Sequence, residues 1–225
     1  MIKQLELAAF NLKSALIGLE AEVDRIEFCD DFSTGGLTPK IDDFRKLRKK
    51  SSVPIFVMIR PRGGDFFYSS TEISEMKKSI EVFKNLGADG FVFGALDDKT
   101  MIDKEINSRL VELCAPFPTT FHRAFDRTPS PEISLQNCID CGFSNILTSG
   151  FESTALKGVA TLNNLKNLAQ NRINLVVGGG VRSTNLAELI GDISTRFYHS
   201  SAIISKKEFA DIDELKLMIQ LLRHD

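Results

Sequence analysis

The amino-acid sequence predicts a (β/α)8 barrel, or TIM barrel, that forms a single domain over residues 1–225. A short apolar segment followed by an amphipathic segment recurs eight times, which gives about 28 residues per βα unit, a spacing within the range of this fold. An open doubly wound sheet is the main alternative. The eighth apolar segment is followed by one last helical segment before the chain ends, and this order favours a closed barrel.

The apolar segments are expected to be strands. They are short and rich in Val, Ile and Phe, and they carry few polar residues on either face, which is typical of parallel strands buried on both faces. They occupy residues 5–10, 25–29, 55–60, 90–96, 119–123, 145–149, 174–178 and 197–201.

The segments between the strands place apolar residues three and four positions apart, with Lys, Glu, Asp and Asn on the other side, which predicts helices with one solvated face. They occupy residues 11–22, 41–50, 72–86, 104–114, 133–141, 159–170, 184–191 and 212–222. Gly87 and Gly142 lie where a left-handed residue ends a helix. Thr71 with Ser74, and also Ser183, are candidates for capping helix starts.

The composition places the chain among ordinary folded proteins, because 43% of its residues are hydrophobic and 26% are charged. The net charge of −2 offers no basic surface for nucleic acid. No apolar run reaches the length of a membrane span, and the first residues do not resemble a signal peptide. We therefore expect a cytoplasmic protein without membrane or nucleic-acid partners, in which the four cysteines stay reduced.

In a (β/α)8 barrel the functional site lies at the carboxyl ends of the strands. The polar residues and glycines of this chain gather at those ends: Glu27, Cys29, Asp30, Arg60, Arg62, Asp65, His122, Arg123, Asp126, Ser149, Gly179, Gly180, His199, Ser200 and Ser201. Packing alone does not explain such clustering, so we expect a site there.

Strand alternation predicts which of these side chains point into the barrel. Residues two apart share a face, so Glu27 and Cys29 point the same way, inward if Ile26 and Phe28 face the helices. The same rule turns Glu6, Arg60 and His122 inward. Buried charges need partners. Glu6, Glu27 and Arg60 are therefore either one structural ion network or part of a catalytic site.

An anion site is predicted around the glycines after the seventh strand. Gly179 and Gly180 precede a helix start, a place where backbone N–H groups often hold phosphate, although a tight turn is the alternative interpretation. Ser200 and Ser201 on the eighth strand would complete the cradle. The other residues assigned to anion binding are Arg62, Arg123 and Ser149.

The cysteines fall into two groups. Cys138 and Cys141 form a C-x-x-C pair, but they lie inside an expected helix, so we interpret them, like Cys114, as buried apolar residues. Cys29 ends a strand at the predicted site. Its thiolate, with the imidazole of His122 or His199, would suit a soft ion such as Cu(I).

Several strings resemble the CutC family, named for copper homeostasis: RIEFCDDFSTGGLTP, VMIRPRGGDFFYS, GADGFVFGAL, TFHRAFD, LTSG and the pair GGGV and HSSA. The resemblance covers residues 5–202. It implies a TIM barrel in the cytoplasm, a role in copper homeostasis, and a homodimer or larger homo-oligomer. Cys29 matches the family's strand-two cysteine, one of those proposed to touch copper. The chain departs at Ala8, where the family often has cysteine.

Two functions of different classes follow. The first is a copper-binding homeostasis protein, not itself an enzyme, with Cys29 and His122 or His199 as ligands of Cu(I). The second is a barrel enzyme acting on a small phosphorylated or carboxylated metabolite, favoured because three arginines at one face attract an anion and repel a cation.

In the enzyme hypothesis, Arg60 and Arg62 clamp the anion. Glu27 or His122 is the general acid or base, and Asp126 orients the network around them.

Overall fold

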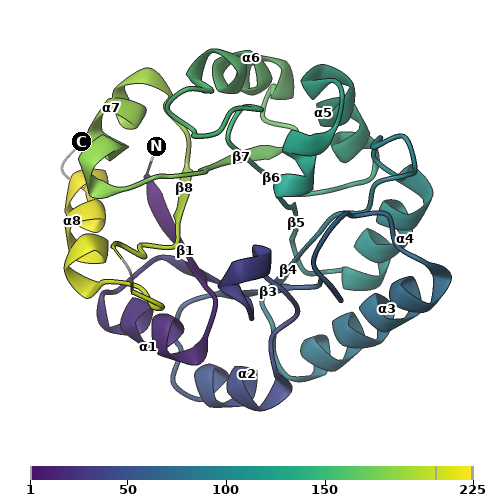
Figure 1. Cartoon of the computed structure of the whole chain (residues 1–225), viewed down its shortest axis with the longest axis horizontal. Helices are drawn as coiled ribbons and strands as arrows, with labels where there is room; N and C mark the ends of the chain where they lie inside the picture. The colour runs from purple at the N-terminus through teal and green to yellow at the C-terminus, as the bar shows by residue number, and fades with distance from the viewer. Residues whose placement is uncertain (1, 206, 224–225) are drawn as a thin grey trace.

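The computed structural model describes residues 2–205 and 207–223. Eight parallel strands form a closed barrel in sequence order, with β8 pairing with β1, and the helices surround it as an outer ring (Figure 1). The predicted fold class is therefore confirmed, and the open-sheet alternative is excluded.

The strands are short and buried, as the sequence predicts. Their bounds are β1 (Gln4–Ala9), β2 (Arg25–Phe28), β3 (Ile55–Met58), β4 (Gly90–Phe93), β5 (Thr119–Phe121), β6 (Asn145–Thr148), β7 (Asn174–Gly178) and β8 (Phe197–Ser200). Two short 3-10 helices, η1 (Phe32–Thr34) and η2 (Arg123–Arg127), follow β2 and β5 directly, so both lie at the carboxyl ends of the strands.

Each strand is followed by a helix. The helices are α1 (Leu12–Glu20), α2 (Ile41–Arg48), α3 (Ser70–Asn85), α4 (Lys104–Cys114), α5 (Pro131–Asp140), α6 (Val159–Ala169), α7 (Ser183–Asp192) and α8 (Ile212–Arg223). In the described part of the chain, no helix combines the length and the apolar character that crossing a bilayer requires.

Helix ends agree with the sequence prediction better than helix starts. Gly87 and Gly142 have φ values of +88° and +85° and follow the last turns of α3 and α5. The cap of α3 is Ser69, not Thr71 or Ser74, because Ser69 and Glu72 exchange hydrogen bonds in a capping box. Ser183 does not cap α7. It is the first helical residue, and its N–H donates to the carboxylate of Glu214.

The barrel separates two kinds of core. Ile26 and Phe28 belong to the large core between the sheet and the helices, so the alternate residues of β2 point into the barrel, as expected. A small interior cluster contains Cys29, Phe56, Met58 and Val92. A second contains Leu147, Val176 and Phe197. Polar residues, among them Glu6, Arg25 and Glu27, are also buried in the interior.

Candidate functional site

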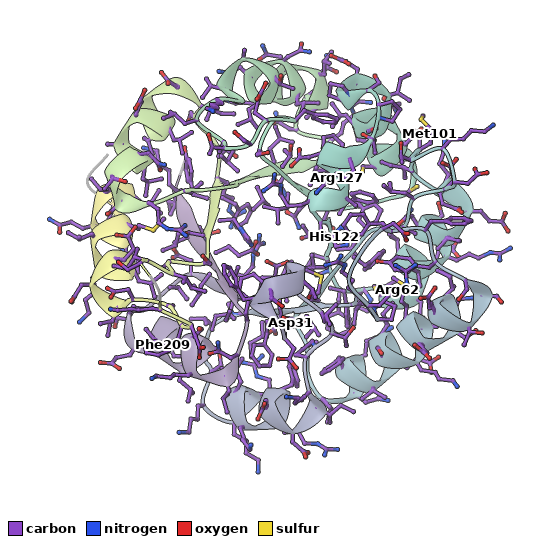
Figure 2. The ribbon with its side chains drawn as sticks, viewed as in Figure 1. Asp31, Arg62, Met101, His122, Arg127 and Phe209 are labelled. Atoms are coloured by element: carbon purple, nitrogen blue, oxygen red, sulfur yellow. The ribbon has the colours of Figure 1, made fainter. Side chains whose placement is uncertain are left out.

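A cavity of about 1190 Å³ opens at the carboxyl ends of the strands. Most of the predicted site residues line it: Glu27, Cys29, Arg60, His122, Arg123, Asp126, Gly179, Gly180, His199, Ser200 and Ser201. Figure 2 shows His122 on the β4–β5 side of the barrel and Arg62 farther out, toward α3. Arg62 and Ser149 do not line the cavity.

The floor of the barrel holds a buried ion pair between Glu6 and Arg25, whose exposed fractions are 1% and 6%. The guanidinium of Arg25 also lies over the rings of Phe56 and Phe197, at 4.4 and 4.1 Å from their centroids. The partner of Glu6 is thus Arg25, and the expected network through Arg60 is wrong. The sequence analysis did not predict a role for Arg25, although Arg25 precedes Glu27 by two residues and its side chain lies on the same face of β2.

Next to this pair, Glu27 and His199 form the central contact of the site. Glu27 Oε2 lies 2.5 Å from His199 Nε2. Burial lowers the pKa of His199, but the charge and hydrogen bond of Glu27 outweigh it, so the net pKa is raised. The other oxygen, Glu27 Oε1, is buried and has no hydrogen-bond partner among the described residues. It is an acceptor available to a bound molecule.

One cluster of three residues that could ligate a metal occurs among the described residues: Glu6, Glu27 and His199 place donor atoms within 4.8 Å of one another. These donors are oxygen and nitrogen atoms. Such ligands suit Mn²⁺ or Zn²⁺, whereas Cu(I) is selected by sulfur. The cluster therefore lacks the sulfur ligands that select Cu(I).

His122 presents a hydrogen-bond donor to the cavity. Its Nδ1 accepts a hydrogen bond from the N–H of Ala124, which leaves the proton of the neutral ring on Nε2. Nε2 is buried without a partner in the described residues. Burial and the charge of Arg60 lower the pKa of His122 to about 3, so the ring is neutral at physiological pH.

His122 should make the fold sensitive to acid. Its pKa falls from 6.5 to about 3 on folding, so below the higher value the unfolded chain binds more protons. Stability is then lost as pH falls, by about 1.4 kcal/mol per pH unit for this one group. Urea unfolding between about pH 6 and pH 4 should show a shallower decline for His122→Asn than for wild type, and parallel curves would contradict a buried neutral imidazole.

Arg60 holds loops together instead of presenting a free fork to an anion. Its Nη1 donates to the carbonyl oxygens of Thr34 and Gly36, and its Nη2 donates to that of Gly64. The guanidinium also lies 4.8 Å from the centroid of the Phe66 ring. These contacts make Arg60 a positioning residue for the loops after β2 and β3.

Arg62 does not converge with the other arginines. It pairs with Glu72 and Asp65 and donates to the carbonyl oxygens of Gly63, Asp65 and Phe67, which uses every N–H of the guanidinium. The expected clamp by Arg60 and Arg62 therefore finds no support in the geometry. The capping box of α3 fixes the carboxylate of Glu72 where it pairs with Arg62, and this pairing holds Arg62 away from the cavity.

Arg123, Asp126 and Ser149 form a compact network beside β6. Arg123 Nε donates to Asp126, and Arg123 Nη2 donates to Ser149 Oγ at 2.8 Å. Asp126 also accepts from the Thr148 hydroxyl and from the N–H groups of Ser149 and Phe151. Asp126 thus links Arg123 to the chain at the end of β6. Ser149, fully buried, holds Arg123 in place.

The loops after β7 and β8 meet through a residue that the sequence reasoning missed. Arg182 lines the cavity and donates to the hydroxyls of Ser200 and Ser201. It also donates to the carbonyl oxygens of Val181 and Ile203. The only signal for it in the sequence is its position two residues after the glycine run.

Cys29 shares a buried cluster inside the barrel with a second sulfur-containing residue, Met58. β2 and β3 pair with Phe28 opposite Val57, and this register, continued by one residue, brings Cys29 beside Met58. Both residues line the cavity and belong to one buried cluster. Burial, then the charges of Glu27 and Glu6, raises the pKa of the Cys29 thiol. Cys114, Cys138 and Cys141 are buried free thiols, as expected.

Fold and site together define a (β/α)8-barrel protein with a polar cavity at the carboxyl ends of its strands. The chain belongs to the CutC family, whose model matches residues 3–204.

The human copper homeostasis protein cutC homolog is 41% identical over 198 residues, which cover 88% of this chain and 72% of the human protein. The Caenorhabditis elegans homolog is 38% identical over 205 residues, covering 91% and 82%.

Solved structures agree with the family and with the fold. CutC from Streptococcus agalactiae superposes with a TM-score of 0.84 at 30% identity, covering 89% of this chain and 99% of the bacterial one. Phosphoribosyl anthranilate isomerase from Thermotoga maritima reaches a TM-score of 0.66 at 16% identity over 99% and 100% of the two chains. The second likeness shows a common fold and nothing further.

Proposed function

We propose that this protein serves copper homeostasis by binding Cu(I) as cargo at the mouth of the barrel. Cys29 is the anchoring ligand and Met58 the second one. The observation that carries this proposal is that Cys29, directly after β2, and Met58, on β3, belong to one buried cluster and line one cavity. Thiolate and thioether sulfur are the protein ligands that select Cu(I). The copper-homeostasis names of the relatives support the same role.

The surroundings of Cys29 favour a cation at this position. The pKa of the thiol is raised first by burial and then by Glu27 and Glu6, whose negative charges oppose a second anion, and the field of these carboxylates attracts a positive ion to the sulfur. The two histidines fit less well as ligands. His199 Nε2 is already engaged by Glu27, and His122 presents a proton on Nε2. We assign both to the polar walls of the cavity.

The test is an anaerobic competition titration of Cu(I) against a strong chelator. Wild type should bind one tight equivalent, and Cys29→Ser should weaken binding by more than about 100-fold, because a lost ligand costs more than a lost outer-shell contact. Cys141→Ser is the matched control, since Cys141 lies at the end of α5 and outside the cavity. Equal binding by wild type and Cys29→Ser would refute the proposal.

The contact between Glu27 and His199 favours a second candidate, an enzyme acting on a small phosphorylated or carboxylated metabolite. A carboxylate hydrogen-bonded to an imidazole at the bottom of a polar cavity can accept and return a proton. Steady-state assays with Glu27→Gln test this function, because the substitution keeps the size of the side chain and removes the carboxylate that would accept the proton.

A further inference from the structure

Beyond the copper site, we propose that the β6–β8 side of the mouth binds the phosphate of a small phosphate monoester with a polyhydroxylated carbon skeleton, such as a sugar phosphate. The phosphate would contact the turn at Gly179 and Gly180 together with Arg123. The skeleton would extend across the cavity to Glu27 and His122. β2 and β3, beside which the sulfur pair lies, are opposite β6 and β7 in the closed barrel, so the phosphate would lie across the cavity from Cys29 and Met58 (Figure 1).

The turn after β7 supplies backbone donors. Gly179 and Gly180 line the cavity with φ values of +110° and +71°. Their N–H groups donate to no acceptor in residues 2–205 and 207–223, and neither does the N–H of Ser201, on the neighbouring strand end. Consecutive free N–H groups at a concave surface are a recognised form of anion cradle. Three such groups at one end of a cavity suit a group with several oxygen acceptors.

Arg123 adds a positive charge at the same turn. Asp126 and Ser149 hold its Nε and Nη2, which orients the guanidinium and leaves Nη1 without a partner among the described residues. A Cβ atom added to Gly179 would lie 3.0 Å from Arg123 Nη1 and 2.8 Å from the Cβ of Ser149. Glycine therefore permits the close approach of Arg123 to the turn. Arg127, from the same 3-10 helix, also lines the cavity.

Two unsatisfied polar atoms define the rest of the ligand. Glu27 Oε1 is an acceptor and His122 Nε2 a donor; both are buried without partners in the part of the chain that the structure describes, on residues that are 2% and 4% exposed. Leaving such atoms unpaired is costly, so a polar ligand that supplies both partners is favoured. A hydroxyl group satisfies the carboxylate, and a hydroxyl or carbonyl oxygen satisfies the imidazole. A polyhydroxylated skeleton carries both, and an apolar one carries neither.

Isothermal titration with ribose 5-phosphate as the probe tests this assignment. Wild type should bind it, bind inorganic phosphate more weakly, and show no measurable binding of ribose. Arg123→Met should weaken binding of ribose 5-phosphate by about 10- to 100-fold, the range for one charge-assisted hydrogen bond. Arg123→Lys should recover part of the affinity. Arg62→Met is the matched control and should bind as wild type does, because Arg62 lies outside the cavity.

Thermal unfolding of each variant first establishes that it folds. No binding of either phosphate compound by wild type would overturn the proposal, as would equal affinity of wild type and Arg123→Met. Ribose binding as tightly as its phosphate would also overturn it, because the skeleton alone would then explain the affinity. The outcome is independent of copper: Cu(I) titration of Arg123→Met should match wild type, since the sulfur pair is untouched.

Discussion

Replacing Arg25 by alanine is expected to lower the free energy of unfolding by about 3–5 kcal/mol, the cost of leaving one charge of a buried pair alone. Glu6, its partner, is 1% exposed and would lose its hydrogen-bonded guanidinium, so that the imidazole of His199, 3.9 Å from Glu6 Oε1 and shared with Glu27, would be the nearest basic group. The stacking of Arg25 on Phe56 and Phe197 would be lost as well. Urea denaturation at neutral pH measures the change.

Arg45→Ala is the control, because Arg45 and Asp42 form an exposed pair with side-chain exposures of 56% and 81%. Such pairs contribute less than about 1 kcal/mol. The double variant Glu6→Gln/Arg25→Met should recover much of the loss, because no unpaired charge remains in the barrel floor. If Arg25→Ala cost no more than Arg45→Ala, the barrel floor would not be a buried ion pair.

The affinity for Cu(I) is expected to rise about tenfold per pH unit, or about 100-fold between pH 6 and pH 8, because the metal displaces one proton from Cys29. The pKa of this thiol is raised in the folded protein by burial and by Glu27, so the thiol is protonated over the whole interval. The measurement is the anaerobic chelator competition, repeated across pH and corrected for the titration of the chelator.

In this experiment Cys141→Ser should keep the slope of wild type. The residual binding of Cys29→Ser should lose it, because serine has no proton to release in this range. Binding of wild type that did not change with pH would show that the ligand is not a protonated thiol, and the assignment of Cys29 would fail.

Most of the fold could be predicted from the sequence, because its signals are local and repeated. Apolar runs alternate with amphipathic segments, and Gly87 and Gly142 mark helix ends through their left-handed conformation. The starts of α3 and α7 were harder to predict. They depend on which of several neighbouring serine and threonine residues forms a hydrogen bond at the helix start. For Ser183 the hydrogen-bond partner is Glu214, thirty-one residues away in the chain.

The sequence predicts which residues lie at the site, but it does not predict which of their charged side chains pair with one another. Strand alternation correctly turned Glu27 and Cys29 into the barrel. Alternation does not say which charges meet, because that depends on the register between strands: Glu6 lies opposite Arg25 in the pairing of β1 with β2. Arg62 was assigned to the site by its place after β3, but the carboxylate of Glu72 draws it away.

Met58 is a second residue whose neighbours depend on strand register and could not be predicted from the sequence. In the sequence it is one more apolar residue of a buried strand, and nothing nearby distinguishes it. Its proposed role depends on the register of β2 and β3, which brings its thioether beside Cys29. A sequence search for metal ligands looks for cysteine and histidine spacing, and it passes over a methionine that a neighbouring strand supplies.

X-ray absorption at the copper edge, on protein loaded anaerobically with one equivalent of Cu(I), tests the central proposal most directly. We expect a first shell dominated by sulfur in wild type, with one sulfur neighbour fewer in Met58→Leu and no tightly bound copper in Cys29→Ser. A first shell of nitrogen and oxygen, unchanged in both variants, would contradict the proposal and would instead assign the metal to Glu6, Glu27 and His199.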